Sequence, residues 1–338
     1  MNVAIETDNL SKTYGMGIKA VDGVSFSVAA GEIFGFLGPN GAGKSTTIMM
    51  LTTLIRPTSG TAKVMGIDVV RDPQGVRKTI GYVSQDIAVD ENLTGRENLR
   101  LQAEFYHVPR SQIGERIREV LKMVDLEDRA DDLVSSYSGG MRKRLDIAEG
   151  LLHRPKVLFL DEPTLGLDIQ TRRRIWDYVR RLRDEHGLTI FVTTHYMEEA
   201  DSLCDRIAII DHGKIVAEGS PEGLKKALGG DVISLKVRNS AGEICGDGVG
   251  RVIEKMPFVQ RAIAESDGIF TVIVRDGEKA VPRLLSSLSE SGITVDSITL
   301  KRASLDDVFL HYTGRELRED GGKSEFHRMR TALRRARK

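Results

Sequence analysis

The sequence predicts an α/β fold in which a parallel sheet carries an inserted helical subdomain and is followed by a small α+β domain. Short, almost continuous apolar runs recur along the first part of the 338-residue chain. Strands that are apolar on both faces are typical of parallel sheets covered by helices. A stretch without such runs interrupts the series, and shorter units with a different rhythm follow it. We therefore expect two domains, with a helical insertion in the first.

Four apolar runs predict the strands of the parallel sheet. Segments with helical patterns lie between them, and this alternation indicates an α/β core. We expect this core to belong to a first domain of residues 1–228. The runs begin at Ile33, Val157, Leu188 and Arg206 and read IFGFLG, VLFLD, LTIFVTT and RIAII.

A helical subdomain is predicted inside that domain, over about residues 92–152. No strand signal occurs there, and three helical patterns follow one another. The last pattern has the spacing of an amphipathic helix. It places on one face Met141, Leu145, Ala148 and Leu152.

A different rhythm begins after Gly230. The predicted elements follow in the order strand, helix, strand, strand, helix, strand, which is the ferredoxin-like arrangement. We therefore expect a small α+β domain over residues 229–314 and a basic tail over residues 315–338. The predicted strands cover residues 232–237, 259–264, 269–274 and 293–300, and the predicted helices cover residues 250–255 and 278–289.

Composition excludes several classes of protein. Lys and Arg number 49 and Asp and Glu number 49, so no overall charge attracts the chain to nucleic acid, and no nucleic-acid partner is expected. Cys204 and Cys245 lack metal-ligand spacing and are too few for a disulfide framework, which suits a reducing cytosol. No apolar run approaches the roughly 20 residues of a membrane-spanning helix, and the first residues lack a signal-peptide pattern. If the chain serves a membrane process, another polypeptide must cross the bilayer.

A phosphate-binding loop follows the first apolar run. The pattern G-x-x-x-x-G-K-[ST] stands between a predicted strand and a helical stretch over residues 46–54, which is the context that this motif requires. Its glycines let backbone N–H groups wrap phosphates, Lys44 can reach the β- and γ-phosphates, and Ser45 can bind Mg²⁺. The expected nucleotide-binding residues here are Gly38, Pro39, Asn40, Gly41, Ala42, Gly43, Lys44, Ser45 and Thr46.

Two adjacent carboxylates end the second apolar run. Asp161 and Glu162 stand at the carboxyl end of a buried strand, where α/β sheets present ligands. Asp161 is placed to hold Mg²⁺, and Glu162 to orient and polarise the water that attacks the γ-phosphate. A strand that ends in two acids is by itself usually a solvated turn, so this interpretation depends on the phosphate loop.

His195 and Gln85 follow two further strand-like segments. His195 comes after LTIFVTT, so its imidazole is expected at the edge that presents the two carboxylates, near the γ-phosphate. Gln85 follows residues 80–83 at a similar edge. A lone histidine is more often structural, and a lone glutamine is more often a polar surface residue. The shared edge favours the functional interpretation.

A second candidate anion site lies in SSYSGGMRKRLD at residues 135–146, which we call the signature segment. Ser138, Gly139 and Gly140 open a predicted helix, whose first N–H groups and dipole favour an anion. Ser138 comes 94 residues (138 minus 44) after Lys44. The signature segment can therefore lie away from the phosphate loop of its own chain.

Together these residues resemble the ATP-binding subunits of ABC transporters, over roughly residues 1–225. The signature segment resembles the signature sequence of that family, Gln85 its switch glutamine and His195 its switch histidine. Asp168 resembles the aspartate of the short loop after the second phosphate motif, and Tyr14 the aromatic residue that stacks on adenine. The resemblance implies a P-loop NTPase of the ABC type that binds ATP and Mg²⁺ and hydrolyses the nucleotide.

The resemblance also implies roles for these residues. Gln85 joins Ser45 and Asp161 as a ligand of Mg²⁺. The implied catalytic residues are Lys44, Gln85, Glu162 and His195.

A homodimer is a further implication. In this family two nucleotide-binding domains pack head to tail and trap ATP between them. Ser138, Gly139, Gly140 and Asp168 of one copy would then act in trans on the nucleotide held by the other copy. Hydrolysis would remove the bridging phosphate and release the pair.

The signature segment departs from the commonest family pattern at two positions. Tyr137 stands where leucine is usual, and Met141 where glutamine is usual. This variant resembles the branch of drug-resistance and antibiotic exporters that includes the daunorubicin-resistance type, and SLDDVFLHYTGRE at residues 304–316 resembles the extension of that branch. The same residues predict a plain amphipathic helix. Its apolar stripe is Leu305, Val308, Phe309 and Tyr312.

The basic tail has two interpretations. Phe326, Met329, Leu333 and Ala336 have helical spacing among arginines, and such a helix could lie on anionic lipid. Charge runs at chain ends are more often solvated and disordered, which is the favoured interpretation.

The leading prediction is an ATP-hydrolysing subunit that drives export of a drug, antibiotic or lipid-like substrate through a separately encoded membrane permease. The chain is then expected at the cytoplasmic face of the cell membrane, as a peripheral protein. One alternative is a soluble ABC-type ATPase of ribosomes or chromosomes. Chromosomal members of the family carry a long coiled-coil insertion, and ribosomal members usually carry a duplicated cassette. This sequence shows neither feature. The other alternative is a nucleotide-dependent regulatory scaffold, against which the intact Glu162 and His195 argue.

Overall fold

The computed structural model describes residues 2–227, 230–239, 248–264 and 268–313 and divides the chain into two compact units. The first unit ends at Ser220 and the second begins at Pro221. Each unit has a hydrophobic core of its own. Cys245 and the predicted tail of residues 315–338 lie outside the described residues.

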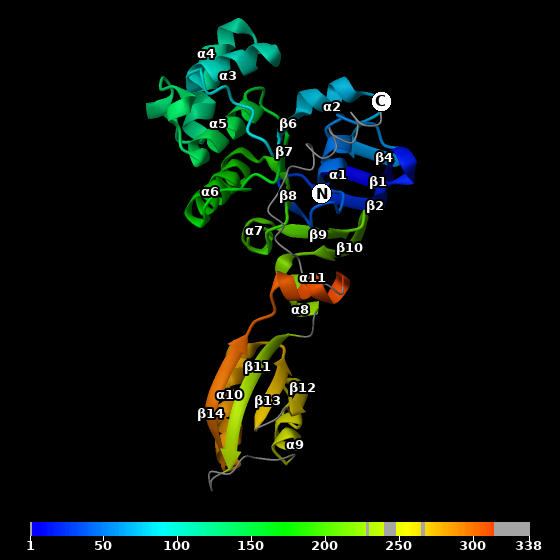
Figure 1. Ribbon diagram of the computed structural model, residues 1–338, viewed down its shortest axis with the longest axis vertical. Helices are drawn as coiled ribbons and strands as arrows, with labels where there is room; N and C mark the ends of the chain where they lie inside the picture. The colour runs from blue at the N-terminus through cyan, green and yellow to red at the C-terminus, as the bar shows by residue number, and fades with distance from the viewer. Residues whose placement is uncertain (1, 228–229, 240–247, 265–267, 314–338) are drawn as a thin grey trace. The chain divides into compact units, whose positions relative to one another are not determined.

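A six-stranded sheet forms the centre of the first unit (Figure 1). Its strands are β3 Ile33–Leu37, β6 Ile80–Val83, β7 Val157–Asp161, β8 Thr189–Thr194, β9 Arg206–Asp211 and β10 Lys214–Gly219. They lie in the order β10-β9-β3-β8-β7-β6, and all neighbours are parallel except β10 and β9. Every residue of β3, β7 and β8 is buried. The four predicted apolar runs are therefore central or near-central strands, and the predicted α/β class is confirmed.

A second, antiparallel sheet packs against the first, and the sequence patterns do not predict it. Its strands lie in the order β2-β1-β4-β5 and alternate buried and exposed residues, so they form no continuous apolar run. The Phe26 ring lies 5.5 Å from the rings of Phe34 and Phe36, and 5.9 Å from that of Phe191, between centroids. These aromatic contacts join the two sheets in one core. The bounds are β1 Val3–Thr13, β2 Lys19–Ala29, β4 Ser59–Val64 and β5 Ile67–Asp68.

The helices of the first unit form two groups (Figure 1). Those around the sheets are α1 Lys44–Leu51, α2 Pro73–Thr79, α6 Ile169–His186 and α7 Met197–Leu203. The predicted helical subdomain contains α3 Gly95–Phe105, α4 Arg110–Met123 and α5 Gly139–Leu151. Thr94 and Glu97 form a reciprocal capping box at the start of α3. Of the predicted apolar face of α5, Leu145, Ala148 and Leu152 are fully buried and Met141 is partly buried.

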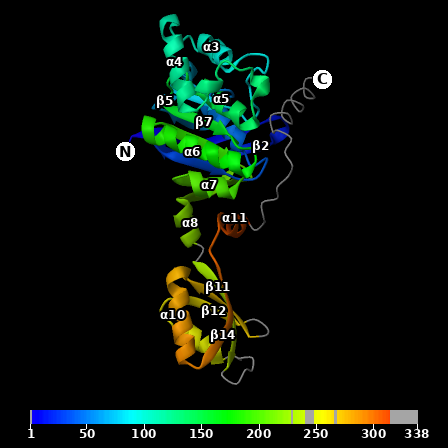
Figure 2. The ribbon, with the colours of Figure 1, turned by 90° about the vertical axis from the view of Figure 1, so that its left-hand side faces the viewer.

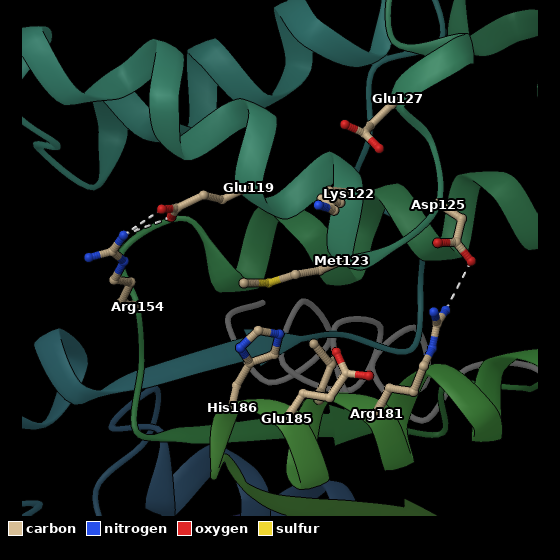
Figure 3. A pocket seen from close by; sticks show the side chains of 10 residues that line it. Glu119, Lys122, Met123, Asp125, Glu127, Arg154, Arg181, Glu185 and His186 are labelled. Carbon is tan, nitrogen blue, oxygen red and sulfur yellow. Dashed lines mark hydrogen bonds and ion pairs between the residues drawn. The ribbon is translucent and has the colours of Figure 1, made fainter.

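A cavity of about 680 Å³ lies between the helical subdomain and α6 (Figure 3). Two ion pairs stand at its margin, with nitrogen–oxygen distances of 2.6 Å for Arg154 and Glu119 and 2.9 Å for Arg181 and Asp125. Exposed pairs of this kind contribute roughly 0–1 kcal/mol each, so they add little to stability. The residues that line this cavity include none of the predicted site residues.

Helix α5 lies directly against β6 because two glycines meet there. A Cβ atom at Gly81 of β6 would lie 2.2 Å from the carbonyl oxygen of Gly150 on α5. The helix that begins at the signature segment and the strand that leads to Gln85 are therefore in backbone contact.

Glu149, the residue before this contact, is 9% exposed. Burial, together with the nearby Asp146 carboxylate, raises the pKa of Glu149 to about 8. The carboxyl group is therefore largely neutral in the folded chain at pH 7.

The second unit has the predicted ferredoxin-like order. Its antiparallel sheet has the strand order β12-β13-β11-β14, and α10 runs along one face (Figure 2). The bounds are α8 Pro221–Ala227, β11 Asp231–Asn239, α9 Gly248–Glu254, β12 Val259–Ala264, β13 Ile269–Val274, α10 Gly277–Glu290, β14 Ile293–Lys301 and α11 Leu305–Thr313. Leu305, Val308 and Phe309 of the predicted stripe are buried, whereas Tyr312 is 41% exposed.

Replacement of Gly81 by alanine should destabilise the chain. The new methyl group would meet the backbone of α5, which cannot move aside as a flexible side chain could, and overpacking of this kind costs about 1–3 kcal/mol. Gly114→Ala is the matched control, because that exposed helical position has nothing within 4 Å of the added atom. Denaturant unfolding should show a loss for Gly81→Ala and no loss for Gly114→Ala; equal stability of the two variants would contradict the contact.

The stability of the chain should fall as pH rises from about 5 to about 9, in part because of Glu149. Between the unfolded pKa and the folded pKa of about 8, the folded state holds a proton that the unfolded state has lost, so rising pH favours unfolding. Glu149→Gln cannot ionise and should remove this part of the slope, with a gain at pH 9 of at most about 5 kcal/mol. Unfolding free energies measured across this pH range test the prediction, with the exposed Glu115→Gln as the control. Parallel pH profiles for Glu149→Gln and the wild type would refute the role of Glu149.

Candidate active site

The predicted phosphate loop connects β3 to α1. Lys44 folds back over it, and its Nζ donates hydrogen bonds to the carbonyl oxygens of Gly38 (2.8 Å) and Pro39 (3.1 Å). Gly43 has a φ of 108°, and a Cβ atom there would lie 2.3 Å from the carbonyl oxygen of Ala20. The loop can therefore keep this close backbone path only with glycine at position 43.

The rest of the loop is anchored to its surroundings. Ala42 is 3% exposed, and its carbonyl oxygen accepts a hydrogen bond from the N–H of Gly213 at 2.9 Å. Thr46, in the first turn of α1, is 4% exposed. Asn40 and Gly41 lie at the turn between Pro39 and Ala42, as the sequence predicts.

Asp161, at the end of β7, faces α1. Its Oδ1 accepts hydrogen bonds from the hydroxyls of Ser45 (3.2 Å) and Thr193 (2.5 Å). Thr193 was not among the predicted residues, although a threonine near the end of a predicted buried strand and two residues before His195 is a usable signal. Ser45 and Asp161 are 116 residues apart in the chain, and the fold brings them together.

Glu162 turns to the other side, as expected for adjacent side chains at a strand end. Its Oε1 lies 3.0 Å from Nζ of Lys44, and its Oε2 lies 3.3 Å from Nδ1 of His195. Glu162 adopts a φ of 46°, an uncommon conformation for a residue other than glycine. Its backbone N–H donates to the Oγ1 of Thr193 (3.1 Å), which holds this turn in place.

The two carboxylates have different protonation behaviour. Burial raises the pKa of Asp161 to about 6, although the hydrogen bonds from Thr193 and Ser45 act in the opposite direction. Burial acts in the same way on Glu162, but His195 and Lys44 outweigh it and hold the pKa of Glu162 below its ordinary value. Glu162 is therefore ionised at neutral pH and can accept a proton.

The donor atoms present fit a magnesium ion. Mg²⁺ prefers oxygen ligands and is commonly held by one or two protein groups together with phosphate oxygens. The Ser45 hydroxyl and the Asp161 carboxylate meet beside the phosphate loop. Among the described residues there is no group of three or more His, Cys, Asp and Glu side chains that could hold a metal without such additional oxygens.

Gln85 lies two residues after β6, and β6 pairs with β7 in register Val83 to Leu160. The Gln85 side chain is partly buried. It therefore stands near the sheet edge where Asp161 follows Leu160. This placement is the one that the sequence analysis expects for Gln85.

Tyr14 directly follows β1 of the antiparallel sheet. Its backbone N–H donates to the carbonyl oxygen of Ile18 at 2.9 Å, which closes the turn toward β2. At the start of β2, Ala20 contacts Gly43 of the phosphate loop. The hairpin that carries Tyr14 therefore borders that loop.

The signature segment lies in the helical subdomain. Ser138 caps α5, and its hydroxyl accepts a hydrogen bond from the N–H of Met141 at 3.3 Å. Cβ atoms added at Gly139 and Gly140 would lie 3.5 Å from Leu167 and 2.5 Å from Thr171, respectively. The start of α5 thus packs against the start of α6, close to Asp168.

Asp168 is the N-cap of α6. Its carboxylate accepts from the backbone N–H of Thr171 (3.0 Å) and from its hydroxyl (2.6 Å). Arg172 donates to the carbonyl oxygen of Leu167 (3.0 Å) and stacks on the ring of Tyr196 at 3.8 Å. The Tyr196 ring in turn lies 4.1 Å from the ring of its neighbour His195. The sequence analysis missed Arg172 and Tyr196, whose pairing depends on the tertiary structure.

The structure therefore gathers the predicted residues in two groups. The binding half contains Lys44, Ser45, Asp161, Glu162 and His195, around the edge of the six-stranded sheet. The signature half contains Ser138, Gly139, Gly140, Leu167 and Asp168, where α5 meets α6. Figure 1 shows α5 among the helices of the subdomain and α1 beside the sheets.

Tyr137, one of the two departures from the usual signature, is 4% exposed. Its hydroxyl donates to the carbonyl oxygen of Arg129 at 2.5 Å. A Cβ atom at Gly95, the first residue of α3, would lie 2.5 Å from this hydroxyl. Tyr137 therefore anchors the signature segment inside the helical subdomain.

Comparison with known proteins agrees with this geometry. The family profile described as "ABC transporter" matches residues 21–165, and the profile described as "ATP-binding protein DrrA1-3-like, C-terminal domain" matches residues 219–313. The chain is 42% identical to the daunorubicin resistance ATP-binding protein DrrA3 of Streptomyces coeruleorubidus, with 94% of this chain and 98% of the relative covered. It is 38% identical to the linearmycin resistance ATP-binding protein LnrL of Bacillus subtilis, with 93% and 100% covered.

Solved structures give the same result. CbiO1 of Clostridium perfringens, part of an ABC transporter complex, superposes with a TM-score of 0.63 at 28% identity, over 66% of this chain and 91% of that chain. A dimeric ATP-binding cassette in a post-hydrolysis state, bound to ADP and Pi, superposes with a TM-score of 0.58 at 30% identity, over 64% and 98%. The resemblance found in the sequence is confirmed, and the chain belongs to the ATP-binding subunits of ABC transporters, which are ATPases.

Proposed function

We propose that this subunit hydrolyses ATP at the binding half, with Glu162 as the group that activates water. The observation that carries the proposal is the position of Glu162, held between Lys44 and His195 and directly after Asp161. Glu162 is ionised and can draw a proton from water as it attacks the γ-phosphate. His195, on the far side of Glu162 from Lys44, contacts the γ-phosphate or the attacking water.

The phosphate loop, the binding half and the neighbouring residues Tyr14 and Gln85 hold the nucleotide. The N–H groups of the loop and the Lys44 ammonium bind its phosphates, and Tyr14 stacks on the adenine. Ser45, Asp161 and Gln85 hold Mg²⁺, which neutralises charge on the phosphates when it is bound.

We further propose that the complete site forms between two copies of the chain. The binding half lies at the edge of the six-stranded sheet, whereas Ser138 and Asp168 of the signature half cap the starts of α5 and α6. The N-terminus of α5, with Ser138, Gly139 and Gly140, would close over the γ-phosphate held by the other copy, beside Asp168. Dimeric relatives of known structure support this arrangement.

A membrane permease is the proposed third component, and export the proposed direction of transport. Relatives that match over nearly their whole length are named for daunorubicin resistance, linearmycin resistance and Nod factor export. Among the described residues no helix has both the length and the apolar character to span a bilayer. Leu101 and Phe105, one turn apart on α3, are 44% and 68% exposed and offer an apolar surface for such a partner. Docking there would place the subunit at the cytoplasmic face of the membrane.

The two alternatives find less support. The relatives are transporter subunits rather than ribosomal or chromosomal ATPases. A scaffold without catalysis would not need an ionised carboxylate between a lysine and a histidine.

Glu162→Gln should bind ATP but lose turnover. The amide keeps the shape of the side chain and cannot accept a proton, so kcat should fall by about 10² to 10⁴, and dimers should accumulate in Mg-ATP. ATPase assays and sedimentation measure the two effects. Glu198→Gln, the same change at a half-exposed residue of α7, should behave as wild type. Unchanged hydrolysis by Glu162→Gln would reject the role given to this residue.

Two inactive variants should complement each other if the site forms in trans. Lys44→Gln disables the nucleotide site of its own copy, and Ser138→Arg obstructs the half that a copy lends to its partner. In a mixed dimer both defects fall in one composite site and the other site stays intact, so turnover should recover to about a quarter of wild type at most. An equimolar mixture as inactive as its two components would contradict the trans arrangement.

A further inference from the structure

Helix α5 carries a buried ion pair that the proposed mechanism does not use. Nζ of Lys143 lies 3.0 Å from Oδ2 of Asp146, and the two residues are 2% and 5% exposed. They stand one turn apart, on the helix that begins at Ser138.

Both members of this pair lie against the segment that contains Gln85. The Lys143 ammonium donates a hydrogen bond to the carbonyl oxygen of Ser84, directly before Gln85, at 2.8 Å. The Asp146 carboxylate holds the Lys143 ammonium in place, and the backbone N–H of Ala88 is near enough to lower the pKa of this carboxyl against the larger effect of burial. The pair therefore attaches the chain at Ser84 to α5 and lies close to it again at Ala88.

Stability does not account for this pair. Removing two charges from water carries a large desolvation penalty, and well-packed apolar residues in place of a buried pair are often neutral or stabilising. Burial raises the pKa of Asp146 in spite of the nearby Lys143 ammonium, the direction that desolvation of this carboxylate is expected to give. The role of the pair is better indicated by what it contacts, which is the backbone beside Gln85.

Neighbouring contacts also pack α5 tightly against the strand that leads to Gln85. Gly81 and Gly150 bring β6 against α5 with no room for a side chain. Burial raises the pKa of the Tyr82 phenol, next in the strand, and the nearby carboxylates of Asp161 and Asp146 add to this effect.

We propose that Lys143 and Asp146 are positioning residues that fix Gln85 to the helix of the signature segment. Gln85 then follows α5 when that helix moves toward the nucleotide of a partner copy, and Gln85 reaches its own nucleotide only when α5 is in the position that closes the site. This inference rests on the proposed function, because it assigns to the pair an effect on ATP turnover through Gln85.

The test compares an apolar pair with an amide pair in the full-length chain. Lys143→Met with Asp146→Leu removes the ion pair and the hydrogen bond to Ser84, and kcat should fall about tenfold or more while the Kd of Mg-ADP changes less than about twofold. Lys143→Gln with Asp146→Asn removes the charges but can still donate to Ser84 and keeps an amide oxygen at position 146, and it should retain most of kcat. Thermal unfolding should place the midpoint of both variants within about 5 °C of wild type.

The matched control is the pair Asp177 and Arg180 of α6. It has the same spacing on a helix, and Arg180 also donates to a backbone carbonyl, that of Ser202. Asp177→Asn with Arg180→Gln should leave kcat within about twofold of wild type.

The outcomes separate this inference from the proposed function. Loss of turnover in Glu162→Gln, together with wild-type kcat in the apolar pair, overturns the inference and leaves the proposed function intact. Equal kcat in the apolar and amide pairs also overturns it. If the apolar pair lowers the unfolding midpoint too far for assay, Lys143→Asp with Asp146→Lys replaces it. This swap keeps the attraction between positions 143 and 146, but it places a carboxylate opposite the carbonyl oxygen of Ser84. A kcat equal to that of the amide pair would overturn the inference.

Discussion

The buried ion pair of Lys44 and Glu162 is the constraint on which the site depends. The two side chains are 3% and 7% exposed and 3.0 Å apart, and either charge alone would be costly at such a position. The cost is offset because Lys44 also donates to Gly38 and Pro39, and Glu162 also contacts His195. These contacts require β3, β7 and β8 to end at one edge. The parallel strands of the six-stranded sheet supply that edge. In the proposed reaction, phosphate oxygens bind the Lys44 ammonium.

Much of the fold and the binding half could be predicted from the sequence, because the information is local. An apolar run followed by a polar residue identifies a buried strand and the edge where that residue emerges, as for Asp161 and His195. The two-sheet core was not predictable in this way, since β1 and β2 alternate buried and exposed residues. Thr193 was also missed, because its partner Asp161 lies 32 residues away in the chain. Lys143 and Asp146 both lie in the signature segment, but the sequence does not show that Lys143 reaches Ser84, 59 residues away.

The unusual signature residue Tyr137 illustrates a second limit of motif reading. The sequence shows a tyrosine where leucine is usual, but not what accommodates its hydroxyl. The structure supplies a hydrogen-bond acceptor, the carbonyl oxygen of Arg129, and the space above Gly95. A buried hydroxyl requires both. Tyr137 and Gly95 therefore form one steric unit, and the variant signature is a feature of the whole helical subdomain rather than of the signature segment alone.

The two halves of the site are connected inside one chain by two sets of contacts. One runs from α5 through Lys143 to the segment of Gln85. The other runs from the loop before α6 through Arg172 to Tyr196, which stacks beside His195. Both begin at the signature half, which in the proposed dimer a copy offers to its partner, and end beside Gln85 and His195, which in the proposed site face the nucleotide of their own copy. In that proposed dimer each chain would link two composite sites, and closure of one site would act on the geometry of the other through packed side chains.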